Sequence, residues 1–111
     1  MKFTSHNVAG SVEILAADHF IGIPVEIDET GVVLAGTPIT AVGKKAADGT
    51  GAAGILLYDV DTDCNKNGTI VVQGVIDQRK AEAHAGVTYN VSALKTAVPG
   101  VVLRSNIGVN A

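Results

Sequence analysis

The chain has 111 residues, with one cysteine and no tryptophan, and its 8 basic and 11 acidic residues give a formal charge of −3. This length predicts one domain, and the charge disfavours binding to nucleic acids or anionic membranes, which needs clustered basic residues. A single cysteine excludes an internal disulfide and a cysteine-based zinc site. Because the sequence lacks an apolar run of signal-peptide or membrane-helix length, we expect a soluble protein made in the cytoplasm.

The amino-terminal part predicts an arm followed by a hairpin. Residues 1–22 are small and polar apart from a short apolar stretch, which is typical of a loosely held arm. Residues 23–28 alternate apolar and polar after Pro24, which favours an edge strand. A turn at 29–31 and a returning strand at 32–35 complete the predicted hairpin.

The middle of the chain carries the strongest strand signals. Residues 54–58 and 69–76 are nearly continuous aliphatic runs bounded by turn residues, which predicts two strands covered on both faces. Between them, alternating acids indicate one polar face of an extended segment that turns at Asn67-Gly68, so we expect a second hairpin here. The other expected segments are a break at 36–38, a short strand or crossing segment at 39–42, and a polar loop at 44–50.

Short helices are expected toward the carboxyl end. Asp77 is placed to cap a helix at 78–85, and Gly86 follows where a left-handed residue is favoured. Ser92 is placed to cap a second helix at 93–97, which must stop before Pro99. Further strands are expected at 87–91 and 101–103.

These elements predict a mainly β fold with one or two short helices, an α+β class in a small single domain. The arm occupies residues 1–22 and the β-rich domain residues 23–111.

A glycine-rich stretch, GTGAAG at residues 49–54, matches the dinucleotide-binding pattern letter for letter. That fingerprint needs a strand before it and a helix after it, so that the amino end of the helix meets the pyrophosphate. Here a polar loop precedes the glycines and a strand follows them. The sequence therefore predicts a glycine loop that leads into a buried strand, and no cofactor site.

The stretch DVDTDCNKNG, residues 59–68, places acids at alternate positions and raises the question of a calcium loop. An EF-hand loop needs glycine at its sixth position and glutamate at its twelfth, where this chain has Cys64 and Ile70. We therefore expect the polar end of a hairpin and no metal site. A weak, incidental cation site at Asp59, Asp61 and Asp63 is the alternative.

Other catalytic patterns are missing from the sequence. The three histidines lie far apart, and His84 is expected to be exposed on its helix. Cys64 has no base nearby in sequence, so we expect a half-buried structural thiol. We predict no catalytic, cofactor-binding or metal-binding residue, and no enzymatic activity.

Several segments, taken in order, resemble the tailed-bacteriophage head decoration proteins of the lambda type. The resemblance covers roughly residues 20–104, and it depends on the order and spacing of the segments more than on any one of them. Its blocks are the turn Ala35-Gly36-Thr37-Pro38, the loop Asp48-Gly49-Thr50-Gly51 with the following run 52–56, the strand 71–77, and the helix and closing strand within 92–101.

The resemblance implies a capsid protein that does no chemistry. Family members bind the outer surface of the expanded shell as homotrimers at three-fold positions, where they contact the major capsid protein and stabilise the shell against DNA pressure. The family's amino-terminal arm adds a strand to the capsid, so Val12, Glu13, Ile14 and Leu15 are the capsid-binding candidates here. The implied location is the virion surface. The alternative is the base domain of a phage head fibre or another small β-rich binding module.

Overall fold

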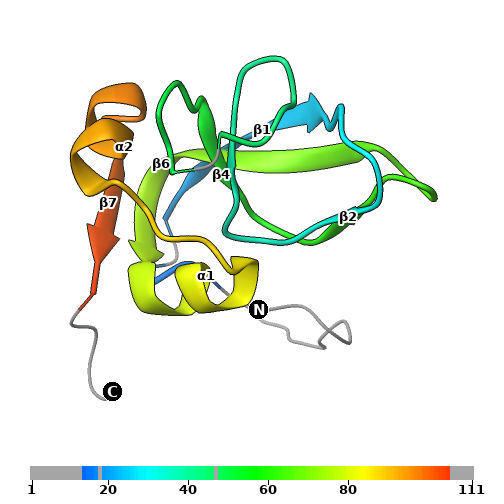
Figure 1. The fold of residues 1–111 in the computed structure, drawn as a ribbon. Helices are drawn as coiled ribbons and strands as arrows, with labels where there is room; N and C mark the ends of the chain where they lie inside the picture. The colour runs from blue at the N-terminus through cyan, green and yellow to red at the C-terminus, as the bar shows by residue number, and fades with distance from the viewer. Residues whose placement is uncertain (1–13, 18, 47, 106–111) are drawn as a thin grey trace.

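The computed structural model describes residues 14–17, 19–46 and 48–105, and these form two β-sheets and two short helices (Figure 1). The predicted mainly β single-domain fold is confirmed. In chain order the elements are β1 (Ile21–Glu26), β2 (Val32–Val33), β3 (Pro38–Ile39), β4 (Gly54–Leu56), β5 (Val60–Asp61), β6 (Asn67–Asp77), α1 (Gln78–Ala85), α2 (Val91–Ala97) and β7 (Val101–Arg104).

Strand β6 is the long central element to which most of the sheet is attached. Its first half pairs antiparallel with β1 and β4, and β4 pairs in turn with β3. Its second half pairs with β7 in parallel, and Leu15 forms an antiparallel bridge to Ile76. Gly74, with φ of 151°, lies where the first half gives way to the second, and an added Cβ there would lie 2.9 Å from Cβ of Phe20.

The predicted hairpin at residues 23–35 is wrong. Strand β1 pairs with β6, so that Val25 lies opposite Gly68, and β2 pairs with β5 in a separate two-stranded sheet. After β1 the chain turns into the body instead of folding back: Ile27 is fully buried, and the Asp28 N–H donates to the Gly43 carbonyl at 2.9 Å. Tertiary contacts at residues 27 and 28 therefore replace the local return.

The predicted second hairpin is wrong at its turn, although its two strands do pair. Ile55 lies opposite Val71, as expected for antiparallel neighbours. Asn67 and Gly68, however, belong to β6, and the chain turns earlier, where the Asp61 carbonyl accepts the N–H of Cys64 at 3.0 Å and of Asn65 at 2.9 Å. Gly68 serves packing, since an added Cβ would lie 3.1 to 3.3 Å from three core side chains.

The helices form close to where the sequence places them. The Asp77 carboxylate accepts the Lys80 N–H at 3.2 Å, and Gly86 ends α1 with φ of 72°, so both predicted caps of α1 are confirmed. Helix α2 begins two residues earlier than expected, because Asn90 takes the capping position predicted for Ser92. The strand predicted at 87–91 is wrong, and the closing strand is confirmed as β7.

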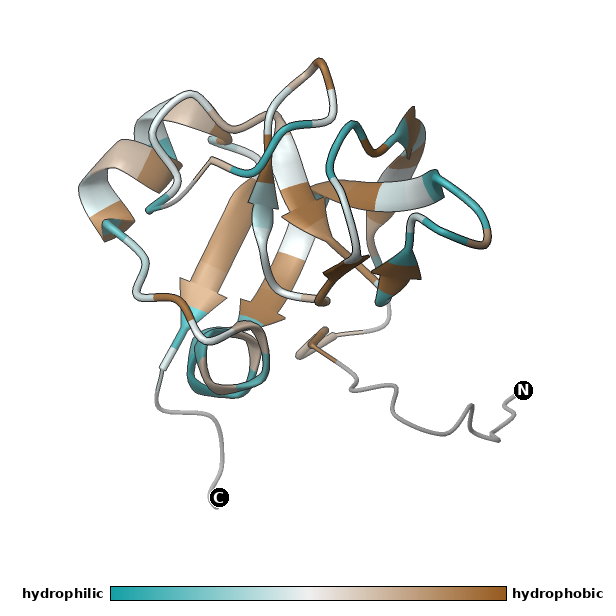
Figure 2. Ribbon diagram, turned by 45° about the vertical axis from the view of Figure 1, so that its right-hand side comes forward, coloured by the Kyte–Doolittle hydropathy of each residue, from teal (hydrophilic) through white to brown (hydrophobic). Residues whose placement is uncertain are grey.

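Two clusters of buried apolar side chains lie on opposite faces of the central strands. The ribbon of these strands is largely hydrophobic in Figure 2. Successive strand residues point to opposite faces, so Ile55 and Val71 enter the larger cluster while Leu56 and Ile70 enter the smaller one. This arrangement confirms that the aliphatic runs of β4 and β6 are covered on both faces where they pair. Helix α1 contributes Ala81 to the larger cluster, and α2 contributes Leu94.

Candidate functional site

Strand β1 is the end strand of its sheet and carries an exposed apolar surface. Large apolar side chains are rarely left in water on an edge strand, because unpaired edges invite association. Yet Phe20 is 40% exposed, Ile21 is 50% exposed and Ile23 is 43% exposed. We call these three residues, together with the backbone of Gly22 and Pro24, the β1 edge.

The hydrogen-bond pattern tells which backbone groups of the β1 edge face outward. The Ile27 N–H donates to the Lys66 carbonyl of the β6 side, whereas the Asp28 N–H donates away from β6, to Gly43. Because strand residues alternate, the backbone N–H and C=O groups of Ile23 and Val25 point toward β6. Those of Gly22, and the carbonyl of Pro24, point outward. Proline has no N–H to donate, so Pro24 fits this outward position without losing a bond to β6.

A shallow depression adjoins the carboxyl end of the β1 edge. It has a volume of about 360 Å³ and is lined by Val25, Glu26, Asp28, Ala41 and Val42. Val42 is 73% exposed, and the Lys44 ammonium lies 3.4 Å from the Asp28 carboxylate. The Glu26 carboxylate has no hydrogen-bonding or ion-pair partner among the described residues. The depression is open and lacks an imidazole, a hydroxyl or a thiol.

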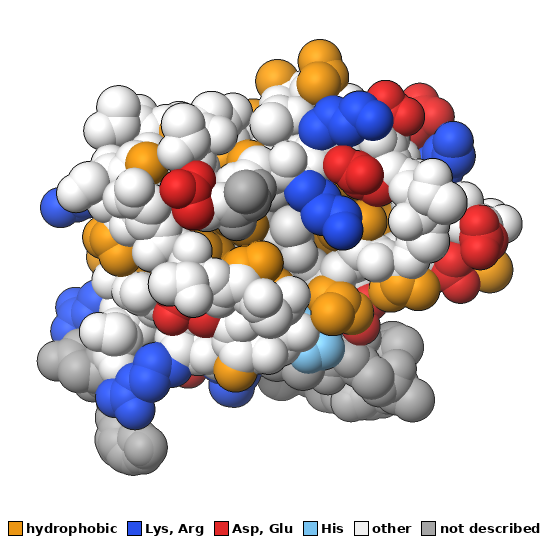
Figure 3. All heavy atoms as spheres, in the orientation of Figure 1, with side chains coloured by type: hydrophobic (Ala, Val, Ile, Leu, Met, Phe, Trp, Pro, Cys, Tyr) orange, Lys and Arg blue, Asp and Glu red, His pale blue; other side chains and the backbone are white. Residues whose placement is uncertain are grey.

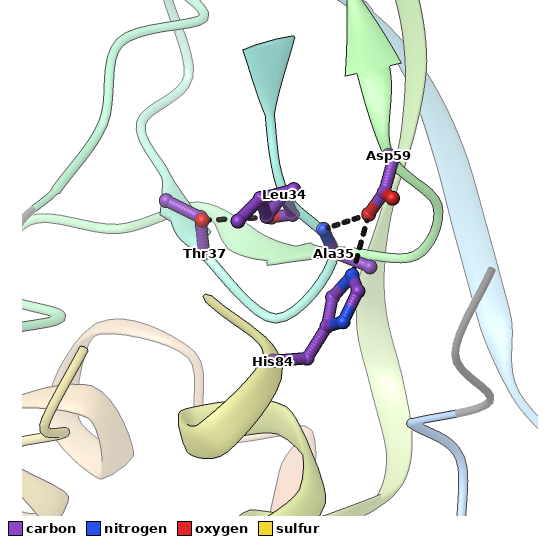
Figure 4. A network of polar contacts seen from close by, with 5 residues as sticks. All are labelled: Leu34, Ala35, Thr37, Asp59 and His84. Carbon is purple, nitrogen blue, oxygen red and sulfur yellow. Dashed lines mark hydrogen bonds and ion pairs between the residues drawn. The ribbon is translucent and has the colours of Figure 1, made fainter. Parts of the chain in front are cut away.

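Asp59 and His84 form a partly buried polar contact between side chains (Figure 4). One carboxylate oxygen of Asp59 accepts the Ala35 N–H at 2.8 Å and lies 2.8 Å from Nε2 of His84. The His84 side chain is 18% exposed and the Asp59 side chain 28%. The prediction that His84 is solvent-exposed is wrong, and so is the expectation that Asp59 lies in water, because α1 packs its imidazole against the segments that follow β2 and β4.

This contact joins α1 to the sheet and offers little for catalysis. A nucleophilic dyad needs a hydroxyl or thiol within hydrogen-bonding distance of the imidazole, and within the described part of the chain His84 has no such partner. Neither Asp59 nor His84 lines the depression. We interpret the contact as a structural tie between helix and sheet.

Asp59, Asp61 and Asp63, the alternative cation site of the sequence analysis, do not gather around one point. Asp59 faces His84, whereas Asp61 accepts the N–H of Asp63 at 3.1 Å within its own turn. Over residues 14–17, 19–46 and 48–105, no group of three or more potential metal ligands gathers. Cys64 is exposed and not half-buried, so that prediction is wrong, and the negative charge of Asp61 raises the pKa of its thiol.

The glycine loop at residues 49–54 leads into a buried strand, as the sequence predicts. All three residues of this strand, β4, are buried, and no helix follows the loop. Gly49 has φ of 110°, and an added Cβ would lie 2.9 Å from Leu94, so this glycine lets the loop pack on α2.

Of the four capsid-binding candidates, the structure describes two. Val12 and Glu13 lie outside the described residues. Ile14 is fully buried in the larger cluster, and Leu15 is partly buried against the same cluster. The Ile14 carbonyl accepts the Asp77 N–H at 2.7 Å, and the Ala16 N–H donates to Val75 at 2.8 Å. Residues 14–16 are therefore packed and paired with the domain, and the Ile14 side chain has no surface open to a partner.

The β1 edge is the feature that the sequence interpretation missed as a site. The sequence does contain a signal for it, because Pro24 inside an alternating run marks an edge strand. What the sequence could not give is the exposure of Phe20, Ile21 and Ile23, which depends on how the described strands are ordered in the sheet.

Comparisons with protein-family models, with curated proteins and with solved structures found no match for this chain. Among the described residues, no helix is long and apolar enough to cross a membrane. We therefore infer function from the residues and contacts of the chain itself.

Proposed function

We propose that this chain is a bacteriophage head decoration protein, which binds the outer surface of the mature capsid as a homotrimer at three-fold positions and stabilises the shell against DNA pressure. The observation that carries the proposal is the β1 edge. It presents Phe20, Ile21 and Ile23 at the end strand of the sheet, which pairs with β6 on one side and, among the described residues, with no strand on the other. Such an edge suits binding through backbone hydrogen bonds and aliphatic contact.

The positions of the blocks that resemble the family also support the proposal. Gly36 of the Ala35–Pro38 turn donates its N–H to Leu56 at 2.8 Å, and its carbonyl accepts the Tyr89 hydroxyl. An added Cβ at Gly36 would lie 2.5 Å from the Ala81 carbonyl of α1. The turn therefore sits where helix and strands meet, and a block that determines packing is one that proteins sharing a fold have reason to share.

Shell binding of this kind needs no reactive group. One such edge gives a weak contact by itself, because side-chain and rotational freedom are lost on association. A trimer presents three such edges at once, and after the first edge binds, the others bind at a high effective concentration. Weak contacts repeated over the shell would then give stable attachment, with the major capsid protein as the partner.

The test is binding to expanded shells assembled from the major capsid protein of the phage that encodes this chain. We expect the purified protein to sediment with expanded shells and to protect them against heat, and to bind unexpanded shells much less. Light scattering should give the mass of a trimer, free or on release from shells. Failure to sediment with expanded shells would contradict the proposal, and capture of a fibre protein instead would favour a fibre base.

A further inference from the structure

We propose that the β1 edge accepts an extended, mainly aliphatic segment that carries a lysine or arginine, and that this segment pairs with Gly22 and Pro24 as an additional strand. The inference goes beyond the proposed function, since it concerns the chemistry of the bound segment and needs no shell. It uses the backbone pattern, the exposed side chains and the charges at one end of β1.

The backbone of the β1 edge is rich in hydrogen-bond acceptors. An outward-facing residue normally offers one N–H and one carbonyl, but Pro24 offers only its carbonyl. The edge from Gly22 to Pro24 therefore presents two acceptors and one donor. An incoming strand satisfies it best when it supplies N–H groups, and an additional side-chain donor is favoured where the edge has no N–H of its own.

The length of the added strand is limited at the carboxyl end of β1. Gly43 approaches the backbone there so closely that an added Cβ would lie only 2.0 Å from the Glu26 carbonyl oxygen. The Gly43 carbonyl also takes the Asp28 N–H. The loop that carries Gly43 thus covers the edge beyond Val25, and the open stretch extends from Phe20 to about Val25.

The acidic residues at the carboxyl end of β1 favour a lysine or arginine in the bound segment. Two acidic residues, Glu26 and Asp28, are among those that line the depression adjoining the open stretch. Lys44 neutralises Asp28, with a 3.4 Å separation, whereas Glu26 has no cationic partner among the described residues. A lysine or arginine of the bound segment can reach Glu26 while its aliphatic stem lies on Val25 and Val42.

The exposed isoleucines of β1 favour aliphatic residues in the bound segment. Ile21 and Ile23 are 50% and 43% exposed on either side of Gly22, where the register of β1 against β6 shifts between Ile21 and Gly22. An aliphatic residue at every second position of the bound segment would cover both. The result is a short strand-addition site that prefers aliphatic residues followed by one cation.

The proposal can be tested with the full chain and a synthetic peptide. The probe is a capped eight-residue peptide of alternating valine and threonine with arginine as its last residue, added to ¹⁵N-labelled protein and followed by NMR. We expect weak binding, with a Kd on the order of 1 mM, and shifts concentrated at residues 20–26. A matched peptide with glutamate in place of arginine should bind roughly 3- to 10-fold more weakly.

Substitutions separate the parts of the site. Glu26→Gln should remove most of the difference between the two peptides. Ile23→Lys should abolish binding, and Ile21→Lys serves as a second variant if the first perturbs the spectrum of the whole domain. Val32→Lys, at an exposed valine of β2, is the matched control that should bind normally.

Three outcomes would overturn the proposal. The first is no shift at residues 20–26 at the highest soluble peptide concentration, and the second is equal binding of the arginine and glutamate peptides. The third is concentration-dependent shifts of the β1 edge without peptide, which would identify a second copy of the chain as the occupant. None of these results depends on shell binding, so they leave the proposed function to its own test.

Discussion

Tyr89 joins three parts of the chain at the level of a single residue. Its hydroxyl donates to the Gly36 carbonyl, and its N–H donates to the Glu82 carboxylate of α1 at 2.8 Å. The ring is almost fully buried in the larger cluster. Burial raises the pKa of the Tyr89 phenol far above its usual range, and the negative charge of Glu82 raises it further. The fold therefore holds the neutral phenol.

We predict a pH-dependent effect of Tyr89→Phe. In the unfolded chain the phenol ionises near pH 10, whereas in the folded chain its raised pKa keeps it protonated to a higher pH. The contribution of Tyr89 is thus complete below about pH 10 and is lost as the pH rises above that value. Below it, the variant should be less stable by about 1 to 3 kcal/mol, because the Gly36 carbonyl loses its partner.

Denaturant unfolding of both proteins from pH 7 to pH 11.5 measures this effect. The difference in the free energy of unfolding should be constant at lower pH and should shrink above about pH 10, at up to about 1.4 kcal/mol per pH unit. A difference that stays constant over the whole range would show that ionisation of Tyr89 is not linked to folding.

Asp59 and His84 illustrate what sequence patterns miss at this scale. The alternating pattern predicts Asp59, Asp61 and Asp63 on one solvent-exposed face of a continuous strand. The strand is instead interrupted between β4 and β5, and Asp59 faces His84. Their separation of 25 residues in the sequence gives no local signal of contact. A polar helix face and an acid-rich segment each look solvent-exposed until the helix is docked.

Helix α1 is held to the sheet by the Asp59 contact, and we predict that Asp59→Ala destabilises the protein by about 1 to 3 kcal/mol. The substitution leaves the half-buried His84 imidazole and the buried Ala35 N–H without their acceptor. Asp61→Ala is the matched control, because Asp61 is exposed and bonds within its own turn, and it should cost much less. Chemical denaturation checks both, and equal losses would argue against a tie between helix and sheet.

The segment at residues 14–16 is an element of the domain and not part of a free arm. We predict that Ile14→Ala lowers the free energy of unfolding by about 2 to 5 kcal/mol, since a fully buried isoleucine leaves a cavity in the larger cluster. Deleting residues 1–13 should change stability much less, because Ile14 and its bond to Asp77 remain. Thermal unfolding compares the two, and a mild effect of Ile14→Ala would place residue 14 outside the core.

Elements that local sequence determines were predictable, whereas their pairing was not. Asp77 and Gly86 define α1 through backbone bonds within a few residues, so the sequence predicts its bounds. The aliphatic runs likewise predict β4 and β6. The hairpins failed because β1 and β2 pair with strands far along the chain, and because Gly68 is required for packing against Val60, Leu56 and Ile27 instead of for a turn.

For the whole molecule, the distribution of charge and the order of the strands are the features that bear on the proposed binding role. Acidic and basic side chains are interspersed on the face shown in Figure 3, so no single sign of charge dominates it. The β1 edge instead combines open backbone with apolar side chains, and it lies at the end of the sheet order β1-β6-β4-β3. The sequence could not predict this exposure, because it depends on which strand the fold places at the end of the sheet.

The most direct test of this account is sedimentation of the protein with expanded shells, comparing the unaltered chain with Ile23→Lys and with the control Val32→Lys. We predict that the unaltered chain and the control bind and that Ile23→Lys loses at least about 10-fold in affinity, since a charge replaces an apolar contact on each of the three edges of the proposed trimer. Circular dichroism should show all three folded. Equal binding of folded Ile23→Lys, or no binding by the unaltered chain, would contradict the central claim.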